Sequence, residues 1–408
     1  MLRGHQKILI YSHDSFGLGH LRRCRVIAHA LVDTRPNLSV LILSGSPIIG
    51  NFSFRSRVDF VRIPGVIKLR HGDYMPLSLK IGIEEILGLR ASIIRHTAES
   101  FDPDVVLVDK EPWGLRGEVR ETLLMLKAKG TPLVLGLRDV MDDPAVLAEE
   151  WRRKNAVRAL TDVYDHIWIY GLPEICDPLQ GVRLPPSVGA KIRYTGYLRR
   201  SILEMDRPLL AVNPFAGQPY ILVTTGGGGD GTDVIDWVLR AYEHDPDIPY
   251  PALLVLGPFM RSTAQAAFME RVARLERVEA ITFDAHVETL MADAAGIVAM
   301  GGYNTFCEIL SFDKRALIVP RSVPRREQSI RAARAEALGL VRTLTIDGDR
   351  DPAKMAEAIG TLPSQPLPSE VRMPGLLEGL AVIDRMIGDW LDADAHVPAR
   401  PSVATAKP

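Results

Sequence analysis

Short runs of apolar, often β-branched residues alternate with helical patterns along most of the chain, and this alternation restricts the fold more than any other feature. The segments between the first runs, such as 21–31 and 84–94, carry apolar residues at helical spacing and polar residues between them. Strands that alternate with helices form βαβ units around a parallel sheet. We therefore expect strands in the first half at 7–12, 38–43, 104–108, 132–137, 166–170 and 191–195.

A second series begins at residue 220 and predicts a second doubly wound domain. Residues 205–219 hold three prolines and no periodicity, which is typical of an inter-domain linker. A chain of 408 residues also exceeds what one hydrophobic core usually supports. We expect a first domain over 1–204, a linker over 205–219 and a second domain over 220–375, whose strands are predicted at 220–224, 252–256, 280–283, 296–300 and 316–319.

Two segments follow the second domain. Residues 376–391 have the pattern of an amphipathic helix, which could pack back across the first domain or lie in an ordinary core. Residues 392–408 are rich in Ala, Pro, Ser and Thr, so we expect a disordered tail.

Composition narrows the class of protein. A formal net charge of -1 supplies no long-range field for nucleic acid, so no nucleic-acid partner is expected. Cys24, Cys176 and Cys307 lie far apart and fit neither a zinc spacing nor an even disulfide framework. The apolar run at 8–11 is too short for a signal peptide or a membrane span. These features favour a cytoplasmic protein.

The first strand runs into a short loop that ends at a helix start. In open α/β sheets, ligands bind at the carboxyl ends of strands beside helix N-termini. Gly17 and Gly19 would let the backbone approach a ligand. His13 and Asp14 stand beside them, on the side where we expect the molecule that accepts a transferred group. His20 is placed to accept a proton from a hydroxyl group or from water. A tight turn with a helix-capping histidine is the alternative.

The second domain opens in the same way, with four consecutive glycines after its first strand. Four glycines lose more conformational entropy on folding than a simple connection requires. Their N–H groups would form a cradle for a diphosphate at the start of the next helix, the alternative being a flexible surface loop. The four residues are Gly226, Gly227, Gly228 and Gly229.

A third cluster of polar residues follows the strand expected at 296–300. Glu308 falls about one turn into the next helix, where its carboxylate could accept hydrogen bonds from both hydroxyls of a ribose. Complementarity to the helix dipole would also explain an acidic residue near a helix start. The other candidates for donor binding in this region are Gly301, Gly302, Asn304, Thr305, Glu327 and Gln328.

These motifs resemble a known family. Residues 283–328 are similar to the donor-binding half of the glycosyltransferases that add N-acetylglucosamine to the lipid intermediate of peptidoglycan synthesis. The resemblance implies the GT-B fold, in which two Rossmann-like α/β domains face each other across a cleft. The match runs through Met291-Ala292-Asp293-Ala294, Gly301-Gly302-Tyr303-Asn304-Thr305, Glu308, Pro320 and Glu327-Gln328.

The resemblance also implies roles for single residues. It places Phe283, Asp284 and His286 beside the nucleobase and Glu308 on the ribose. It implies that the four glycines, with Arg199 or Arg200, bind the diphosphate. It also implies that Glu327 and Gln328 contact the donor sugar and that His20 faces the acceptor.

The first loop departs from this family. Residues 16–24 are closer to a relative that hydrolyses nucleotide-linked amino sugars in the making of pseudaminic acid. Water therefore stays open as the acceptor, and the acceptor half is less defined than the donor half.

The function expected is transfer of a sugar, such as an N-acetylhexosamine, from a UDP-linked donor to a glycan, a lipid-linked molecule or a small molecule. We expect inversion and no cofactor. We also expect no metal, because none of the three loops described above offers an Asp-x-Asp element for a bound cation. A lipid-linked acceptor would require peripheral membrane contact, for which the apolar and basic stretch 52–79 is the candidate. An ordinary buried strand with solvated arginines is the favoured account of this stretch. A nucleotide-sugar hydrolase or epimerase, and a binding protein without catalysis, are the alternatives.

Overall fold

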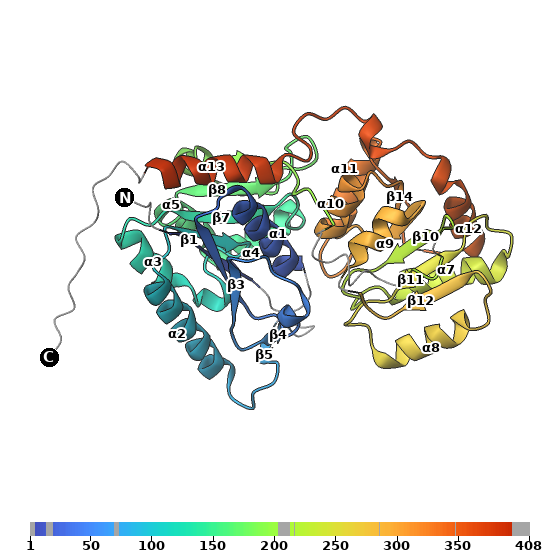
Figure 1. Cartoon of the computed structure of the whole chain (residues 1–408), viewed down its shortest axis with the longest axis horizontal. Coiled ribbons are helices and arrows are strands. Elements are labelled where there is room, and N and C mark those ends of the chain that lie inside the picture. The colour runs from blue at the N-terminus through green and yellow to red at the C-terminus, as the bar shows by residue number, and fades with distance from the viewer. Residues whose placement is uncertain are drawn as a thin grey trace.

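The computed structural model describes residues 5–13, 19–68, 73–202, 213–215, 217–284, 286–346 and 348–393. Two α/β domains lie side by side, and the chain passes from one to the other after β9 (Figure 1). Asp14 and Gly17 of the first loop, most of the expected linker, and residues 394–408 of the expected tail lie outside the described residues.

The first domain is built on a seven-stranded sheet in the order β3-β2-β1-β6-β7-β8-β9. All neighbouring strands of this sheet are parallel. Its central strands are buried along their whole length and read as continuous apolar runs, as expected for strands covered on both faces. The strands are β1 (Gln6–Ser12), β2 (Leu38–Ser44), β3 (Val58–Arg62), β6 (Val105–Asp109), β7 (Leu133–Arg138), β8 (His166–Tyr170) and β9 (Ile192–Tyr194).

The second domain repeats the plan with a six-stranded parallel sheet in the order β12-β11-β10-β13-β14-β15. In both sheets the first strand of the domain lies at the point where the strand order reverses, which is where doubly wound folds bind ligands. The strands are β10 (Ile221–Thr224), β11 (Ala252–Val255), β12 (Val278–Ile281), β13 (Gly296–Ala299), β14 (Ala316–Ile318) and β15 (Arg342–Thr343).

Helices connect the parallel strands of both sheets. Two of them, α4 and α12, begin with an aspartate that caps the helix and a proline at the first turn, which is the usual chemistry of a helix start. The helices are α1 (Gly19–Thr34), α2 (Ile83–Phe101), α3 (Arg120–Ala128), α4 (Pro144–Arg153), α5 (Ala156–Asp162), α6 (Pro186–Gly189), α7 (Thr232–His244), α8 (Ser262–Val272), α9 (Val287–Asp293), α10 (Tyr303–Ser311), α11 (Glu327–Ala337) and α12 (Pro352–Thr361).

The predicted fold class, two doubly wound α/β domains, is confirmed, with three differences in detail. β12 begins two residues before the strand expected at 280–283, because its register is set by pairing Val278 with Ala252 of β11. β15, which extends the second sheet at its edge, was not predicted, and β3 falls within the stretch 52–79, for which a strand was favoured without bounds. The antiparallel hairpin of β4 (Val66–Lys68) and β5 (Tyr74–Pro76) was not predicted either.

The last helix, α13 (Gly379–Ala393), lies along the first domain beside α1 and β8 (Figure 1). Ile383 and Ile387 are buried in the core that contains α1. The indole of Trp390 lies parallel to that of Trp168 in β8, with ring centroids 5.8 Å apart. The chain therefore crosses twice between the domains, and its end adds apolar surface to the domain in which it began.

A buried ion pair joins the domains where the ends of their strands meet. Arg331 of α11 donates from Nε and Nη2 to the carboxylate of Asp139, which directly follows β7, at 2.7 and 2.6 Å. The same guanidinium donates to the carbonyl of Gly301, and the hydroxyl of Tyr197 donates to Asp139 at 2.7 Å. Both partners of the pair are at most 1% exposed. This geometry fixes the first domain against the helix that follows β14.

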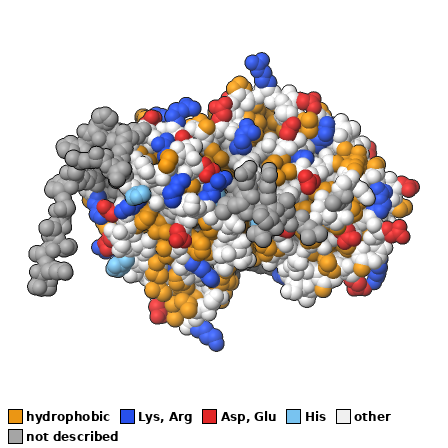
Figure 2. Space-filling view, viewed as in Figure 1, with side chains coloured by type: hydrophobic (Ala, Val, Ile, Leu, Met, Phe, Trp, Pro, Cys, Tyr) orange, Lys and Arg blue, Asp and Glu red, His pale blue; other side chains and the backbone are white. Residues whose placement is uncertain are grey.

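The surface carries charges of both signs. On the face in Figure 2 basic and acidic side chains are interspersed, and hydrophobic side chains gather on the first domain around α2. Met75, Leu79 and Leu89, on or near β5 and α2, are 43–46% exposed.

We predict that Arg331→Leu lowers the free energy of unfolding by about 3–5 kcal/mol, the usual effect of leaving one partner of a buried ion pair uncompensated. Urea unfolding followed by tryptophan fluorescence measures the change. Arg334→Leu, at an exposed position of the same helix, is the matched control. It removes the bonds that this arginine donates across the junction to the carbonyls of Glu174 and Ile175, but no buried ion pair, and should lose about 1 kcal/mol. Equal losses in the two variants would show that the buried pair has no special place in the domain junction.

Candidate active site

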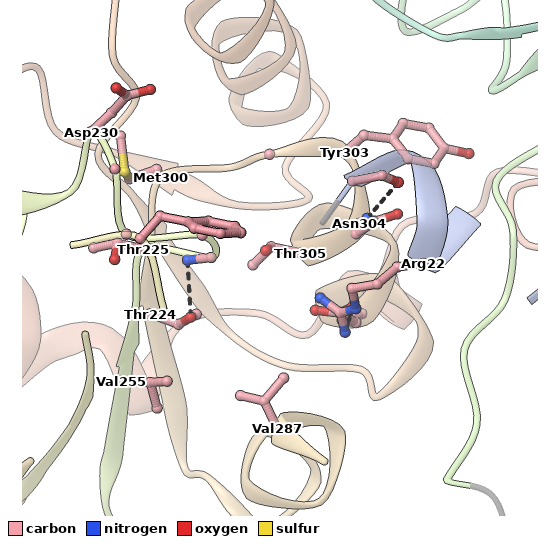
Figure 3. A pocket seen from close by; sticks show the side chains of 18 of the residues that line it. Arg22, Thr224, Thr225, Asp230, Val255, Val287, Met300, Tyr303, Asn304 and Thr305 are labelled. Carbon is pink, nitrogen blue, oxygen red and sulfur yellow. Dashed lines mark hydrogen bonds and ion pairs between the residues drawn. The ribbon is translucent and has the colours of Figure 1, made fainter. Parts of the chain in front are cut away.

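A cavity of about 310 Å³ lies between the two domains and is lined by both (Figure 3). The first domain contributes the start of α1, Phe52 and the end of β7, and the second domain contributes mainly the segments that follow β10, β12, β13 and β14. Of the residues predicted from the sequence, those lining the cavity are Gly19, His20, Gly226, Gly227, Gly228, Gly229, Phe283, Asp284, Gly302, Asn304, Thr305, Glu308, Glu327 and Gln328.

The four glycines form the loop between β10 and α7 on one wall of the cavity. Gly226 and Gly228 have φ values of 65° and 82°, which side chains rarely adopt. A Cβ atom on Gly228 would lie 2.4 Å from the carbonyl oxygen of Leu256, so the loop is pressed against the neighbouring strand end. The N–H of Gly226 bonds to the hydroxyl of Thr224 at 3.3 Å, as drawn in Figure 3. The loop conformation thus requires glycine and brings backbone to the cavity at the start of α7.

On the opposite side, His20 belongs to a buried charge cluster at the start of α1. Its Nδ1 atom contacts the carboxylate of Asp109, the last residue of β6. Arg23, one turn further along α1, donates to both oxygens of the same carboxylate at 2.8 Å. Asp109 is 1% exposed and the side chain of His20 is 16% exposed. The aspartate is thereby held by two groups, His20 and Arg23, and both of them line the cavity.

The cluster determines which protons are present. Burial alone would raise the pKa of Asp109, but Arg23 and His20 outweigh it and hold that pKa below its usual range. Burial lowers the pKa of His20 to about 4, against the opposing effect of Asp109. The imidazole is therefore neutral near pH 7. Nη2 of Arg23 also lies 3.0 Å from Nδ1, but the ionised carboxylate contacts Nδ1 more closely. This closer contact favours the tautomer with its proton on Nδ1, which leaves the lone pair of Nε2 for a substrate.

Glu308 of α10 forms a third feature of the cavity. Its side chain is 1% exposed, and Oε1 lies 2.6 Å from Nη2 of Arg22, which also pairs with Glu288 of α9 at 2.6 Å. Burial raises the pKa of Glu308 to about 7, with Arg22 opposing and Glu288 adding to the shift. Beyond this ion pair, Oε1 has no hydrogen bond to any described residue. This oxygen is able to accept a bond from a ligand hydroxyl.

Two arginines that were not predicted also line the cavity. Arg321 contacts Glu327 at 2.9 Å and Asp230 of the glycine loop at 3.2 Å. Arg138 ends β7, and its Nε is buried without a hydrogen bond among the described residues. Burial lowers the pKa of Arg138 to about 10, Glu327 opposes this, and the neighbouring cations Arg23 and Arg331 add to it. The cavity therefore holds positive charge at Arg321, beside the glycine loop, and at Arg138.

Some predicted residues lie beside the cavity without lining it. His13 is buried, with its ring centroid 5.7 Å from that of His20. His286 donates its backbone N–H to Asp284 at 2.6 Å. Gly301 has a φ of 74° and packs against Ile318. Arg199 and Arg200 line a neighbouring cavity, and Arg200 donates to Asn304 at 2.7 Å.

A sequence signal existed for the residues that were missed. Asp109 and Arg138 stand directly after the apolar runs 104–108 and 132–137, and the carboxyl ends of parallel strands are where such sheets bind ligands. Arg23 was passed over because arginine on a helix is usually a solvated residue. Nothing local in the sequence indicates that Arg22 and Arg23 are buried.

Two doubly wound domains with a ligand cavity between the facing strand ends define the GT-B fold, which the comparisons confirm. The structure matches the glycotransferase of kitacinnamycin (TM-score 0.60, 14% identity, 96% of this chain and 99% of that chain) and MurG of Acinetobacter baumannii (0.56, 13%, 95% and 99%). It also matches Phytolacca americana UGT2 complexed with UDP-2fluoro-glucose and pterostilbene (0.60, 14%, 94% and 94%). No protein-family model and no curated protein matches the sequence.

Within the described residues, no group of three or more His, Cys, Asp or Glu side chains is arranged to hold a metal ion. None of the described helices has the length and apolar character needed to cross a bilayer.

The raised pKa of Glu308 predicts how stability depends on pH. Between its usual value of 4.5 and about 7, the folded protein keeps a proton on Glu308 that the unfolded chain releases. The stability associated with this proton is therefore complete below pH 4.5 and is lost as the pH rises through 7. Relative to Glu308→Gln, the wild-type free energy of unfolding should fall by about 2–3 kcal/mol between pH 5 and pH 8.

Urea unfolding of both proteins at the two pH values measures this difference. Glu357→Gln, at an exposed position on α12, is the control, and its free energy of unfolding should differ little from that of the wild type at either pH. A difference between wild type and Glu308→Gln that is constant with pH would contradict the shifted pKa.

Proposed function

We propose that this protein is a glycosyltransferase that moves a sugar from a nucleotide diphosphate sugar to the hydroxyl group of an acceptor. The observation that carries the proposal is that one cavity brings together a neutral histidine held by an aspartate, a glycine loop at a helix start and a buried carboxylate. These three features match the needs of a base, a diphosphate and a ribose. Solved structures of the same fold that carry UDP or a UDP-sugar analogue support a UDP-linked donor.

In the proposed reaction, the donor lies along the second domain. The N–H groups of the glycine loop and the positive end of α7 hold the diphosphate, and Glu308 accepts hydrogen bonds from the ribose. Phe283 and Asp284 lie beside the base, and Glu327 and Gln328 bind hydroxyls of the sugar. In this arrangement Arg22 shares Glu308 with the ribose.

His20 performs the proton transfer. Its Nε2 takes the proton of the acceptor hydroxyl as the oxygen attacks the anomeric carbon, and Asp109 stabilises the imidazolium that forms. The bond between the sugar and the diphosphate breaks, and its electron pair leaves with the nucleotide. The glycine loop, Arg321 and Arg138 stabilise the growing negative charge, so the reaction needs no metal. Attack from the side opposite the leaving group inverts the anomeric centre.

The donor site is tested by nucleotide binding. At pH 8, where Glu308 is ionised, Glu308→Ala should weaken the binding of UDP by about 2–4 kcal/mol, the scale of two charge-assisted hydrogen bonds. Calorimetric titration measures this, with Glu357→Ala as a control of equal charge change far from the cavity. A Glu308→Ala protein that binds UDP as the wild type does would remove Glu308 from the donor site.

The chemical step is tested by turnover. His20→Ala should keep UDP affinity within about twofold and lower kcat about a hundredfold or more, the usual contribution of a general base. Because the base acts in its neutral form and the pKa of His20 is about 4, wild-type kcat/KM should not fall through this group until the pH approaches 4. His96→Ala, an exposed histidine on α2, is the control.

Full turnover by the His20→Ala protein would exclude the histidine from the mechanism. The acceptor is tested in the same assay by leaving it out. Rapid release of free sugar from UDP-N-acetylglucosamine in buffer alone would identify water as the acceptor and replace the transferase by a hydrolase.

A further inference from the structure

A second cavity, of about 300 Å³, lies outside the cleft and contains a concentration of arginines. One of its walls is a face of α1, where Arg22, Arg25, His29 and Asp33 follow one another at helical spacing. The other walls are Arg55, residues 199–201, Glu288 of α9 and Leu380 of α13. We call this cavity the arginine pocket.

The pocket contains more positive than negative side chains. Five arginines line it, at positions 22, 25, 55, 199 and 200, but only two carboxylates do, those of Asp33 and Glu288. Each carboxylate already has a partner, since Asp33 lies 3.0 Å from Arg55 and Glu288 lies 2.6 Å from Arg22. In the described part of the chain, no ion pair is formed by Arg199 or Arg200.

Buried donors in the pocket also lack acceptors. The Nε atoms of Arg55 and Arg200 are buried, and neither has a hydrogen-bond partner among the described residues. Such a group is unfavourable in an empty protein, because it has lost water and gained no acceptor. His29 reports the same positive surroundings, since burial, together with Arg25 and Arg55, lowers its pKa to about 3. The histidine is therefore neutral and adds no further cation.

The chemistry of the pocket selects the class of ligand. Guanidinium groups bind phosphate through paired, charge-assisted hydrogen bonds, and several of them around one cavity are typical of a phosphate site. A volume near 300 Å³ is at the lower limit for ligand pockets and suits a small molecule. We propose that the arginine pocket binds the phosphate groups of a small soluble phosphorylated molecule, at a site separate from the glycine loop of the cleft.

The position of the pocket connects it to the cleft through one side chain. Arg22 lines both cavities, and its guanidinium contacts Glu288 on the pocket side and Glu308 on the cleft side. Arg200 donates to the backbone carbonyl of Arg22 and to Asn304 of the cleft. Substitution of either residue would disturb the cleft as well, so neither is suitable for testing the pocket.

Arg55 and Arg199 are suitable, because they line only the arginine pocket and lie toward its rim. The side chain of Arg55 is 35% exposed and Arg199 is exposed, so Arg55→Gln/Arg199→Gln should fold as the wild type does. The matched control is Arg158→Gln/Arg274→Gln, which removes the same charge from two exposed arginines on α5 and α8.

The experiment is calorimetric titration of the full chain with inorganic pyrophosphate at low ionic strength and pH 7.5. The pocket variant should bind about tenfold or more weakly, or lose one binding site, because two arginine–phosphate contacts are removed. The control variant should bind as the wild type does. Pyrophosphate bound at the glycine loop would persist in the pocket variant, so a change in that variant belongs to the arginine pocket.

Two outcomes would overturn the proposal. One is equal pyrophosphate binding, or none, by the wild type and the pocket variant. The other is a wild-type protein that sediments with vesicles containing phosphatidylglycerol but binds no soluble pyrophosphate, since the cations would then face a membrane. No nucleotide or sugar enters the experiment, so its result is independent of the proposed transferase activity.

Discussion

The arrangement of the site depends on the buried ion pair between Arg331 and Asp139. Asp139 follows β7 at the carboxyl end of the first sheet, and Arg331 lies on the helix that follows β14 in the second. Arg331, Asp139 and the hydroxyl of Tyr197 form hydrogen bonds with one another and are buried from solvent. These bonds hold the two sheets so that the carboxyl ends of their strands face each other. The cleft is the space that this junction leaves between them. A small displacement at the junction would move His20 relative to the glycine loop, which belongs to the other domain.

Inside the cleft, a second buried cluster gives the histidine its properties. Asp109 would be an unfavourable charge in this position without Arg23, and its contact with His20 would then favour a charged imidazole. With Arg23 present, the aspartate is already neutralised, and the histidine stays neutral while its tautomer and orientation are fixed. Asp109 still orients the imidazole of His20, while Arg23 opposes the effect of Asp109 on its charge. Burial is the main reason that the pKa of His20 lies below its usual value despite the aspartate, and Arg23 adds to this lowering.

The sequence predicted the local features of this structure and missed those that depend on distant pairs. Alternation of apolar runs and helical patterns was sufficient for two doubly wound domains, and glycine-rich loops after strands located His20 and the four glycines, because these signals lie within a few residues of one another. Arg331 and Asp139 are 192 positions apart, and Arg22 and Glu288 are 266 apart. No spacing rule connects such residues, so the ion pairs that join the domains, and the burial of Arg22 and Arg23, could not be read from the chain. Asp109 and Arg138 are an intermediate case, since the position of strand ends would have identified them.

The arginines of this protein fall into two groups with different consequences. Arg23 and Arg331 have carboxylates that satisfy them, and they stabilise the fold. Arg138, Arg200 and Arg55 each bury an Nε without an acceptor among the described residues, which is unfavourable while no anion is present. A cation that has already lost its water gains more from an incoming anion than a solvated one, because the desolvation that binding would require has taken place during folding. The packing of the two domains therefore removes water from these guanidinium groups. We expect anions to bind where such a buried group has no acceptor.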